Sequence, residues 1–195
     1  MVASEWPAGL RGITESVVTT LGPNERWNVA ALGLHAPGEA DGSVTARTWG
    51  RTRTWRNFRE RGEGYVQFTR DPEVFVAAAL TRHGVDDPIL ESTDAWVRVS
   101  VEQLAEGTSG DTKWVEWALS PEEQAVEEVV VPTFNRGYAA VVEATVHASR
   151  LDVEAYDTDT LRERIEYCET VVTRCGGPAE KRAFKAIEDA VDEEL

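Results

Sequence analysis

The chain has 195 residues, 42% of them hydrophobic, so it is long enough to bury one good core with an appended subdomain. Its formal net charge is −15, from 35 acidic residues against 20 lysines and arginines. Such acidity argues against general binding to nucleic acids or membranes, which needs a basic face, and no apolar run approaches the roughly 20 residues that span a bilayer.

The first two-thirds of the chain predicts strands joined by turns. β-Branched residues and an alternation of apolar and polar residues favour strands, while pairs of proline, glycine, asparagine and aspartate mark the turns between them. The elements expected here, in chain order, are a strand over 13–21, a turn at Gly22-Pro23-Asn24, a strand over 26–35, turns at Pro37-Gly38 and Asp41-Gly42, and a strand over 43–48.

Two short helices and a hairpin are expected next. A helix over 52–61 stops at Gly62, a strand covers 65–69, and Asp71-Pro72 supplies an N-cap and first-turn proline for a helix through Arg82. The apolar side chains of 94–104 alternate, and 113–119 returns as its partner. This pattern is typical of a hairpin in a mostly antiparallel sheet.

The last third predicts helices. An apolar stripe runs from Tyr138 to Val146, and residues 161–175 carry a heptad-like seam that includes Cys168 and Cys175. Gly176-Gly177-Pro178 ends that helix and starts another, so 158–195 is expected to form an antiparallel helix hairpin. The cysteines are most simply core residues of the seam, with a reactive thiol as the alternative.

The cysteine usage and the N-terminus favour a reduced cytoplasmic protein. The two cysteines form neither a CxxC pair nor a disulfide framework, and Met1–Trp6 lacks a basic segment followed by an apolar one, so no secretory signal is expected. Only three of the 20 cations are lysines, a balance that resembles the proteins of salt-accumulating halophiles. An acidic protein from a high-GC genome is the alternative.

A basic island stands out in this acidic chain. Six of the seventeen arginines lie within residues 47–61, where Glu60 is the only acid and threonines are interleaved. Arginine forks, threonine hydroxyls and the free N–H groups of a helix start together favour a phosphate site. Arg47 and Arg51 are the candidates for the phosphate. The other four arginines are expected to be solvated or paired with surface acids, and an exposed basic helix or a short RNA-binding arm are the alternatives.

The strand over 27–33 is unusually rich in small residues. Ala30, Ala31 and Gly33 weaken packing unless something flat approaches the backbone, and an isoalloxazine ring is such an object. Tight packing against a neighbouring helix is the alternative.

The order of these motifs resembles FMN-binding split-barrel flavoproteins, which include flavin-reductase-like and pyridoxamine-phosphate-oxidase-like proteins. Thr54-Trp55-Arg56-Asn57-Phe58, followed by the segment from Gly62 to Thr69, looks like the family's threonine-x-x-asparagine helix and next strand. Residues 28–33 are similar to its asparagine-x-alanine-x-x-glycine strand. The match is closest to an uncharacterised, mainly archaeal branch, covers nearly the whole chain, and fits a haloarchaeal origin.

The resemblance implies a fold, a cofactor and a set of site residues. The fold is mainly β with α: an antiparallel, Greek-key-like split β-barrel over 10–132 with a C-terminal helical subdomain over 133–195. The chain would be a homodimer holding FMN near the subunit interface. The cofactor-binding residues implied by position in the motifs are Asn28, Ala30, Arg47, Thr48, Arg51, Thr52, Thr54, Asn57, Gln67 and Thr69.

No separate catalytic machinery is visible. His35, His83 and His147 are scattered, without HExxH or a Cys/His cluster, so no metal site is expected, and no nucleophile elbow, P-loop or GxGxxG occurs. A flavin enzyme needs no strong protein acid or base. The leading hypothesis is an FMN-dependent oxidoreductase with a nicotinamide or other small redox partner. A non-catalytic flavin store or sensor is the second hypothesis, and a nucleic-acid contact domain using the arginine island is the third.

Overall fold

The computed structural model describes residues 6–37 and 42–193, which form seven strands and five helices. The strands are β1 (Ile13–Leu21), β2 (Trp27–His35), β3 (Val44–Trp49), β4 (Glu63–Thr69), β5 (Gly84–Val85), β6 (Thr93–Ser109) and β7 (Thr112–Val126). The helices are α1 (Arg53–Arg61), α2 (Pro72–Leu80), α3 (Arg136–Ala148), α4 (Thr158–Cys175) and α5 (Pro178–Glu193). The predicted turns at 37–38 and 41–42 and the segment 1–5 fall partly or wholly outside the described residues.

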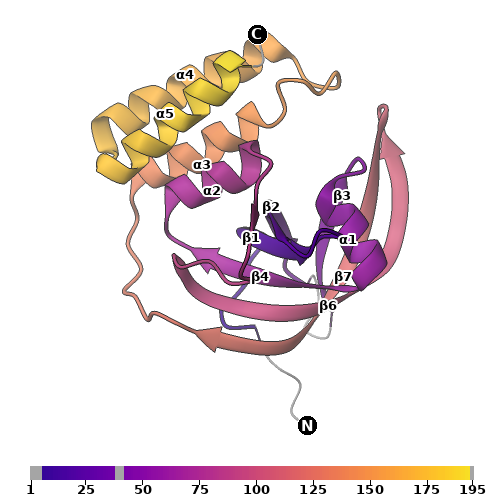
Figure 1. The fold of residues 1–195 in the computed structure, drawn as a ribbon. Helices are drawn as coiled ribbons and strands as arrows, with labels where there is room; N and C mark the ends of the chain where they lie inside the picture. Colours follow the sequence, from indigo (N-terminus) through magenta and orange to yellow (C-terminus); the bar gives the residue numbers. More distant parts are fainter. Residues whose placement is uncertain (1–5, 38–41, 194–195) are drawn as a thin grey trace. The chain divides into compact units, whose positions relative to one another are not determined.

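The chain divides into two compact units, each drawn in Figure 1. The first comprises Met1–Arg70 and Arg82–Val129, and the second comprises Asp71–Thr81 and Val130–Leu195. Helix α2 therefore belongs to the second unit although it lies between two strands of the first in sequence. The predicted domain boundary between 132 and 133 remains a prediction.

Six strands of the first unit close into an antiparallel barrel. They follow one another in the order β1-β4-β6-β7-β3-β2, and β2 pairs back with β1 along its whole length, from Trp27 opposite Leu21 to His35 opposite Ile13. The two-residue strand β5 adds to the start of β2. The predicted antiparallel barrel accompanied by C-terminal helices is confirmed.

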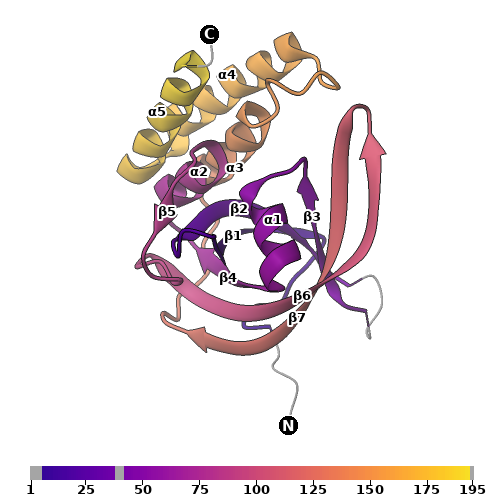
Figure 2. The ribbon, with the colours of Figure 1, turned by 45° about the vertical axis from the view of Figure 1, so that its right-hand side comes forward.

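Alternating side chains fill the barrel, as the strand pattern predicts. The apolar cluster draws residues from every barrel strand and includes Val18, Leu34, Val66, Val97 and Trp117, all of them 2% exposed or less. Helix α1 lies across the ring of strands in Figure 2 and contributes Phe58 to this cluster, where its ring meets Trp117 edge-on at 5.5 Å between centroids. Burial of Phe58 thus fixes α1 against one end of the barrel.

Local capping sets the ends of α1. The Thr52 side chain accepts a hydrogen bond from the N–H of Trp55, and Gly62 adopts a left-handed conformation with φ of 71° and donates its N–H to the carbonyl of Phe58. Both are preferred terminators, and a residue with a Cβ would be strained at Gly62. The helix therefore starts and stops close to where the sequence predicts.

The hairpin of β6 and β7 is longer than the sequence predicts. Beyond the residues that pair with β3 and β4, residues 105–112 pair only within the hairpin and extend from the barrel in both ribbon views. At Gly107 an added Cβ would lie 2.5 Å from the ring of Trp114, so the indole lies directly over the glycine. The glycine is required by this close packing.

The second unit is a four-helix cluster with its own core. Helix α3 packs against α2, α4 and α5, and the buried residues of the cluster include Val76, Val141, Cys168, Val172 and Ile187. Cys168 is a core residue as predicted, whereas Cys175 is only half-buried. No helix among the described residues is both long and apolar enough to cross a membrane.

Candidate functional site

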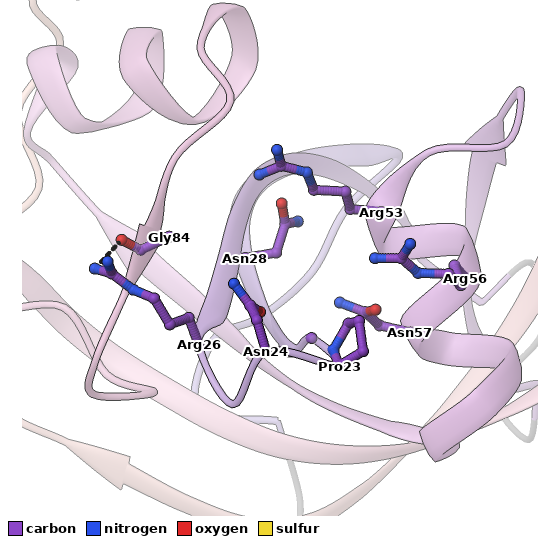
Figure 3. Close-up of a pocket in the computed structure, with 9 residues that line it drawn as sticks. Pro23, Asn24, Arg26, Asn28, Arg53, Arg56, Asn57 and Gly84 are labelled. Carbon is purple, nitrogen blue, oxygen red and sulfur yellow. Dashed lines mark hydrogen bonds between the residues drawn. The ribbon is translucent and has the colours of Figure 1, made fainter.

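A polar cavity of about 430 Å³ lies in the first unit, between α1 and the turn that joins β1 to β2 (Figure 3). This volume is within the range of small-molecule sites, about 300–1,000 Å³. The residues that line it come from the turn, the start of β2, the exposed side of α1 and β5: Gly22, Pro23, Asn24, Arg26, Asn28, Arg53, Arg56, Asn57 and Gly84.

Two arginines of α1 give the cavity its positive charge. Figure 3 shows Arg53 and Arg56 reaching from α1 toward Asn28 and the turn. Among the described residues, neither guanidinium has a carboxylate within 4 Å, although the chain has 35 acidic residues. The cavity wall therefore presents two arginines whose charges are not neutralised locally.

The first turn of α1 adds backbone donors beside them. The N–H groups of Arg53 and Thr54 are at the first two helical positions, where no intrahelical acceptor exists. The helix dipole adds partial positive charge at the same end. An anion at this end of the cavity would meet donors from both side chains and backbone.

The asparagines of the cavity are held by buried hydrogen bonds. Asn28 donates from Nδ2 to Oγ1 of Thr54 at 3.4 Å, which joins β2 to α1. Asn57 donates from Nδ2 to the carbonyl and to Oγ1 of Thr20, at 3.2 and 3.0 Å. Asn28 of β2 is thus brought beside Thr54 and Asn57 of α1, as the sequence motifs predict.

One polar atom of this trio lacks a partner. Oδ1 of Asn57 is buried and accepts no hydrogen bond from the described residues. Leaving a buried acceptor unpaired costs roughly 1–3 kcal/mol, and such orphaned atoms are rare in native proteins. A donor supplied by a bound molecule would remove that cost.

The opposite wall is fixed by Arg26. Its guanidinium donates from Nη2 to the carbonyl of Gly84 at 2.7 Å and forms an ion pair with Asp86 at 3.3 Å, turned away from the cavity interior in Figure 3. Arg26 thus ties the β1–β2 turn to β5. It is a wall residue whose charge is already compensated.

The residues predicted to hold the phosphate from β3 do not line the cavity. Arg47 pairs with Glu116 at 3.1 Å and lies 4.7 Å above the ring of Trp114, while Oγ1 of Thr48 accepts a hydrogen bond from the indole of Trp117 at 2.9 Å. Arg51 lies over Trp55 instead, at 5.9 Å from the ring centroid. The cavity is lined instead by Arg53 and Arg56, which were expected to be solvated or paired, and the assignment of the phosphate to Arg47 and Arg51 remains a prediction.

Gln67 and Thr69 have structural roles in this geometry. The buried amide of Gln67 donates to Thr19 and Pro88 and accepts from Leu90 and Thr93, which uses its full hydrogen-bonding capacity. The hydroxyl of Thr69 donates to the carbonyl of Ser92 at 2.8 Å. Both residues hold the segment before β6 in place, and neither lines the cavity.

The small residues of β2 have a packing explanation. A Cβ on Gly33 would lie 3.2 Å from Cγ2 of Ile13 on the neighbouring strand β1, and Ala30 packs against the barrel core. Packing against a neighbouring element, the alternative raised from the sequence, therefore accounts for these two positions, although the neighbour of Gly33 is a strand and not a helix.

Sequence reasoning missed the part of the cavity that the β1–β2 turn provides. The sequence predicts only a turn at Gly22, Pro23 and Asn24. No pattern of neighbouring residues predicts that this turn lies opposite residues 53–57. The left-handed φ of 55° at Glu25 and its 3.4 Å ion pair with Arg61 fix this turn beside α1. That ion pair links residues 36 positions apart, so no local pattern could reveal it.

The histidines are outside the cavity. Burial lowers the pKa of both His83 and His147, so both are neutral at pH 7. Nδ1 of His147 is buried on α3 without a partner among the described residues, and no group of three or more histidines, cysteines or carboxylates there could hold a metal ion.

Comparison with known proteins gives two matching family models that together cover most of the chain. Residues 14–128 match the model described as "Protein of unknown function (DUF447) N-terminal domain", and residues 135–189 match "Protein of unknown function (DUF447)". These two matches follow the barrel and the C-terminal helices.

Solved structures show the same likeness. An FMN-bound DUF447 protein from Methanosarcina mazei is 27% identical, with a TM-score of 0.78 over 93% of this chain and 96% of that one. A flavin reductase domain protein from Arthrobacter is 13% identical, with a TM-score of 0.46 over 62% and 80%. An FMN-binding protein from Thermus thermophilus is 16% identical, with a TM-score of 0.46 over 68% and 84%.

Proposed function

The chain belongs to the DUF447 family, and from that premise we propose that it binds FMN in the cavity beside α1. The Methanosarcina relative that carries FMN matches this chain along nearly its full length. The observation that carries the proposal is the pair of locally uncompensated arginines, Arg53 and Arg56, at the open end of a helix in a polar cavity. A phosphate monoester is the anion that such a constellation fits.

The residues present fit the polar tail of FMN. Arg53, Arg56 and the first N–H groups of α1 would hold the phosphate. The unpaired Oδ1 of Asn57 needs a donor, which a ribityl hydroxyl has and a phosphate dianion lacks, so Asn57 is assigned to the ribityl chain. Asn28 and Thr54 would complete that part of the site, and Thr52 would act by capping the helix.

The remaining predicted residues are left out of the proposed set. Arg47, Thr48, Gln67 and Thr69 each have a side-chain hydrogen bond to another part of the protein, and Ala30 faces the barrel core. Arg51 lies over Trp55. The cofactor-binding role of these residues remains a prediction from the resemblance.

We propose further that the protein is an oxidoreductase with a nicotinamide or another small redox partner. Bound FMN would supply the hydride or electron transfer, and the chain's task is to fix the cofactor and leave it accessible. The cavity lining contains no histidine, cysteine, lysine or carboxylate, which also suits a flavin store or sensor without turnover. Steady-state oxidation of NADH or NADPH by the loaded protein separates these two functions.

Purified protein is expected to carry or take up FMN. The measurement is the visible absorbance band of flavin in dialysed protein, followed by a fluorescence titration of the cofactor-free protein with FMN. Protein that neither retains flavin nor quenches added FMN at micromolar concentration contradicts the proposed function.

The protein is expected to be a homodimer, as the family resemblance implies. Trp49 is 49% exposed on the first unit, and large exposed aromatic residues favour interfaces. Light scattering at high salt should give about twice 21.6 kDa. A monomer at micromolar concentration excludes the dimer without affecting the cavity.

Salt is expected to stabilise the fold, as in a halophilic archaeal cytoplasm. A net charge of −15 with only three lysines creates self-repulsion, which molar salt screens because it shortens the Debye length to about 3 Å. The melting temperature should therefore rise between dilute buffer and molar salt. A flat or falling melting temperature across that range argues against a halophilic origin.

A further inference from the structure

The arginines of the basic segment are divided between two sides of α1. Arg53 and Arg56 line the cavity, whereas Arg51 and Arg59 lie over the ring of Trp55, at 5.9 and 5.5 Å from its centroid. At 3.6 residues per turn, positions 55 and 59 share one face of the helix. This second face, which we name the Trp55 face, consists of Arg51, Trp55 and Arg59 and does not belong to the cavity.

The charges of the Trp55 face are not neutralised locally. Arg51 and Arg59 are both exposed, and among the described residues neither has a carboxylate within 4 Å. The arginines at the two ends of the segment differ in this respect, because Arg47 pairs with Glu116 and Arg61 with Glu25. In the proposed FMN site the phosphate is held by Arg53 and Arg56, so the Trp55 face is left without a role.

The indole of Trp55 presents these two guanidiniums in a defined position. Trp55 is half-buried and packs against the barrel core, so it is a fixed platform. Cation–π contact with the ring restricts two otherwise mobile side chains, which lowers the entropy lost when they bind something.

We propose that the Trp55 face is a docking surface for an acidic region of a partner protein. Arginine and tryptophan are the residue types most enriched among the strongest contacts of protein interfaces, and arginine forks pair bidentately with carboxylates. Arg51 and Arg59 are exposed and do not line the cavity beside α1, which leaves both guanidiniums accessible to the surface of a partner. Nucleic acid fits less well, because binding to its phosphate backbone draws on many basic contacts, whereas this face has two arginines and the chain as a whole is strongly acidic.

A linear acidic peptide serves as the probe. Poly-L-glutamate of about 20 residues is titrated into the full-length protein by calorimetry, at one fixed salt concentration at which the protein is folded. It should bind the native protein roughly tenfold more tightly than the double variant Arg51→Gln/Arg59→Gln, which loses both guanidiniums of the face. The matched control is Arg11→Gln/Arg174→Gln, which removes the same charge from two other exposed positions and should change the affinity less than about twofold.

Two outcomes overturn the proposal. One is equal affinity of poly-L-glutamate for the native protein and the Arg51/Arg59 variant, which would show that the face is only a solvated surface. The other is tighter binding of a single-stranded oligothymidylate of equal length that depends on the same two arginines, which would assign the face to nucleic acid. The FMN titration is run on every variant in parallel, and it should be unchanged, so a failure here is distinct from a failure of the proposed function.

Discussion

Replacing Arg53 and Arg56 together by glutamine is expected to lower the affinity for FMN by about 10² to 10⁴ while hardly changing the affinity for riboflavin. A hydrogen bond to a charged group contributes roughly 1.5–3 kcal/mol, so losing two costs about 3–6 kcal/mol. Riboflavin has the same ring and ribityl chain but no phosphate, and these two arginines line the end of the cavity where α1 begins. Flavin fluorescence titrations at one fixed high salt concentration measure both affinities.

Two further pairs make this experiment decisive. The double variant Arg47→Gln/Arg51→Gln tests whether these two arginines hold the phosphate, as the sequence predicts. We expect it to leave the FMN affinity nearly unchanged, because Arg47 is paired with Glu116 and Arg51 lies over Trp55. Arg11→Gln/Arg174→Gln controls for the loss of two charges at exposed positions. If all three pairs weaken FMN equally, the arginines act only as a diffuse field. If the Arg47/Arg51 pair alone matters, the phosphate lies at the end of β3.

The sequence located the neighbourhood of the cavity but could not rank its arginines. Composition alone isolates residues 47–61 as basic, and the threonine-x-x-asparagine spacing places Thr54 and Asn57 on one face of a helix. Which arginine is neutralised depends on Glu116, which follows Arg47 by 69 residues and meets it only because β7 pairs with β3. That information is in the tertiary structure and in no local pattern.

Gln67 is a second residue whose role could not be predicted from the sequence. Its position in a motif that resembles a flavin-binding strand predicted a cofactor contact, yet its amide makes four hydrogen bonds that link β4 to β1, to the segment before β6 and to the start of β6. A buried glutamine can satisfy a ligand or the protein, and only the positions of Pro88 and Leu90 decide between the two. Residue type and spacing are equally compatible with both.

The positions of strands and helices along the chain were more predictable than the compact unit to which each element belongs. Alternation and capping residues place β1, α1 and α4 within a few residues of their observed ends, because these signals are local. The assignment of α2 to the helical unit is not local, since it depends on Val76 entering a core formed by α3, α4 and α5. The length of the β6–β7 hairpin was also missed, because its exposed end lacks the apolar alternation of a buried strand.

Gly137→Ala is expected to destabilise the helical unit, although alanine normally stabilises a helix relative to glycine by about 0.5–1 kcal/mol. Gly137 is in the first turn of α3, and a Cβ there would lie 2.5 Å from Cα and 2.6 Å from N of Gly176. Those are backbone atoms just after the end of α4, so no side chain can rotate to make room. The two segments must move apart, which costs about 1–3 kcal/mol by analogy with overpacked cores.

Thermal melting followed by circular dichroism measures this effect. For a chain of this size, that cost lowers the melting temperature by roughly 2–12 °C. Gly9→Ala is the control, because nothing lies within 4 Å of its added Cβ, and it should melt with the native protein. A Gly137→Ala protein that melts at or above the native temperature would show that α3 and Gly176 do not approach as closely as described. FMN affinity should be unaffected by either change in protein that remains folded, because neither glycine lines the cavity.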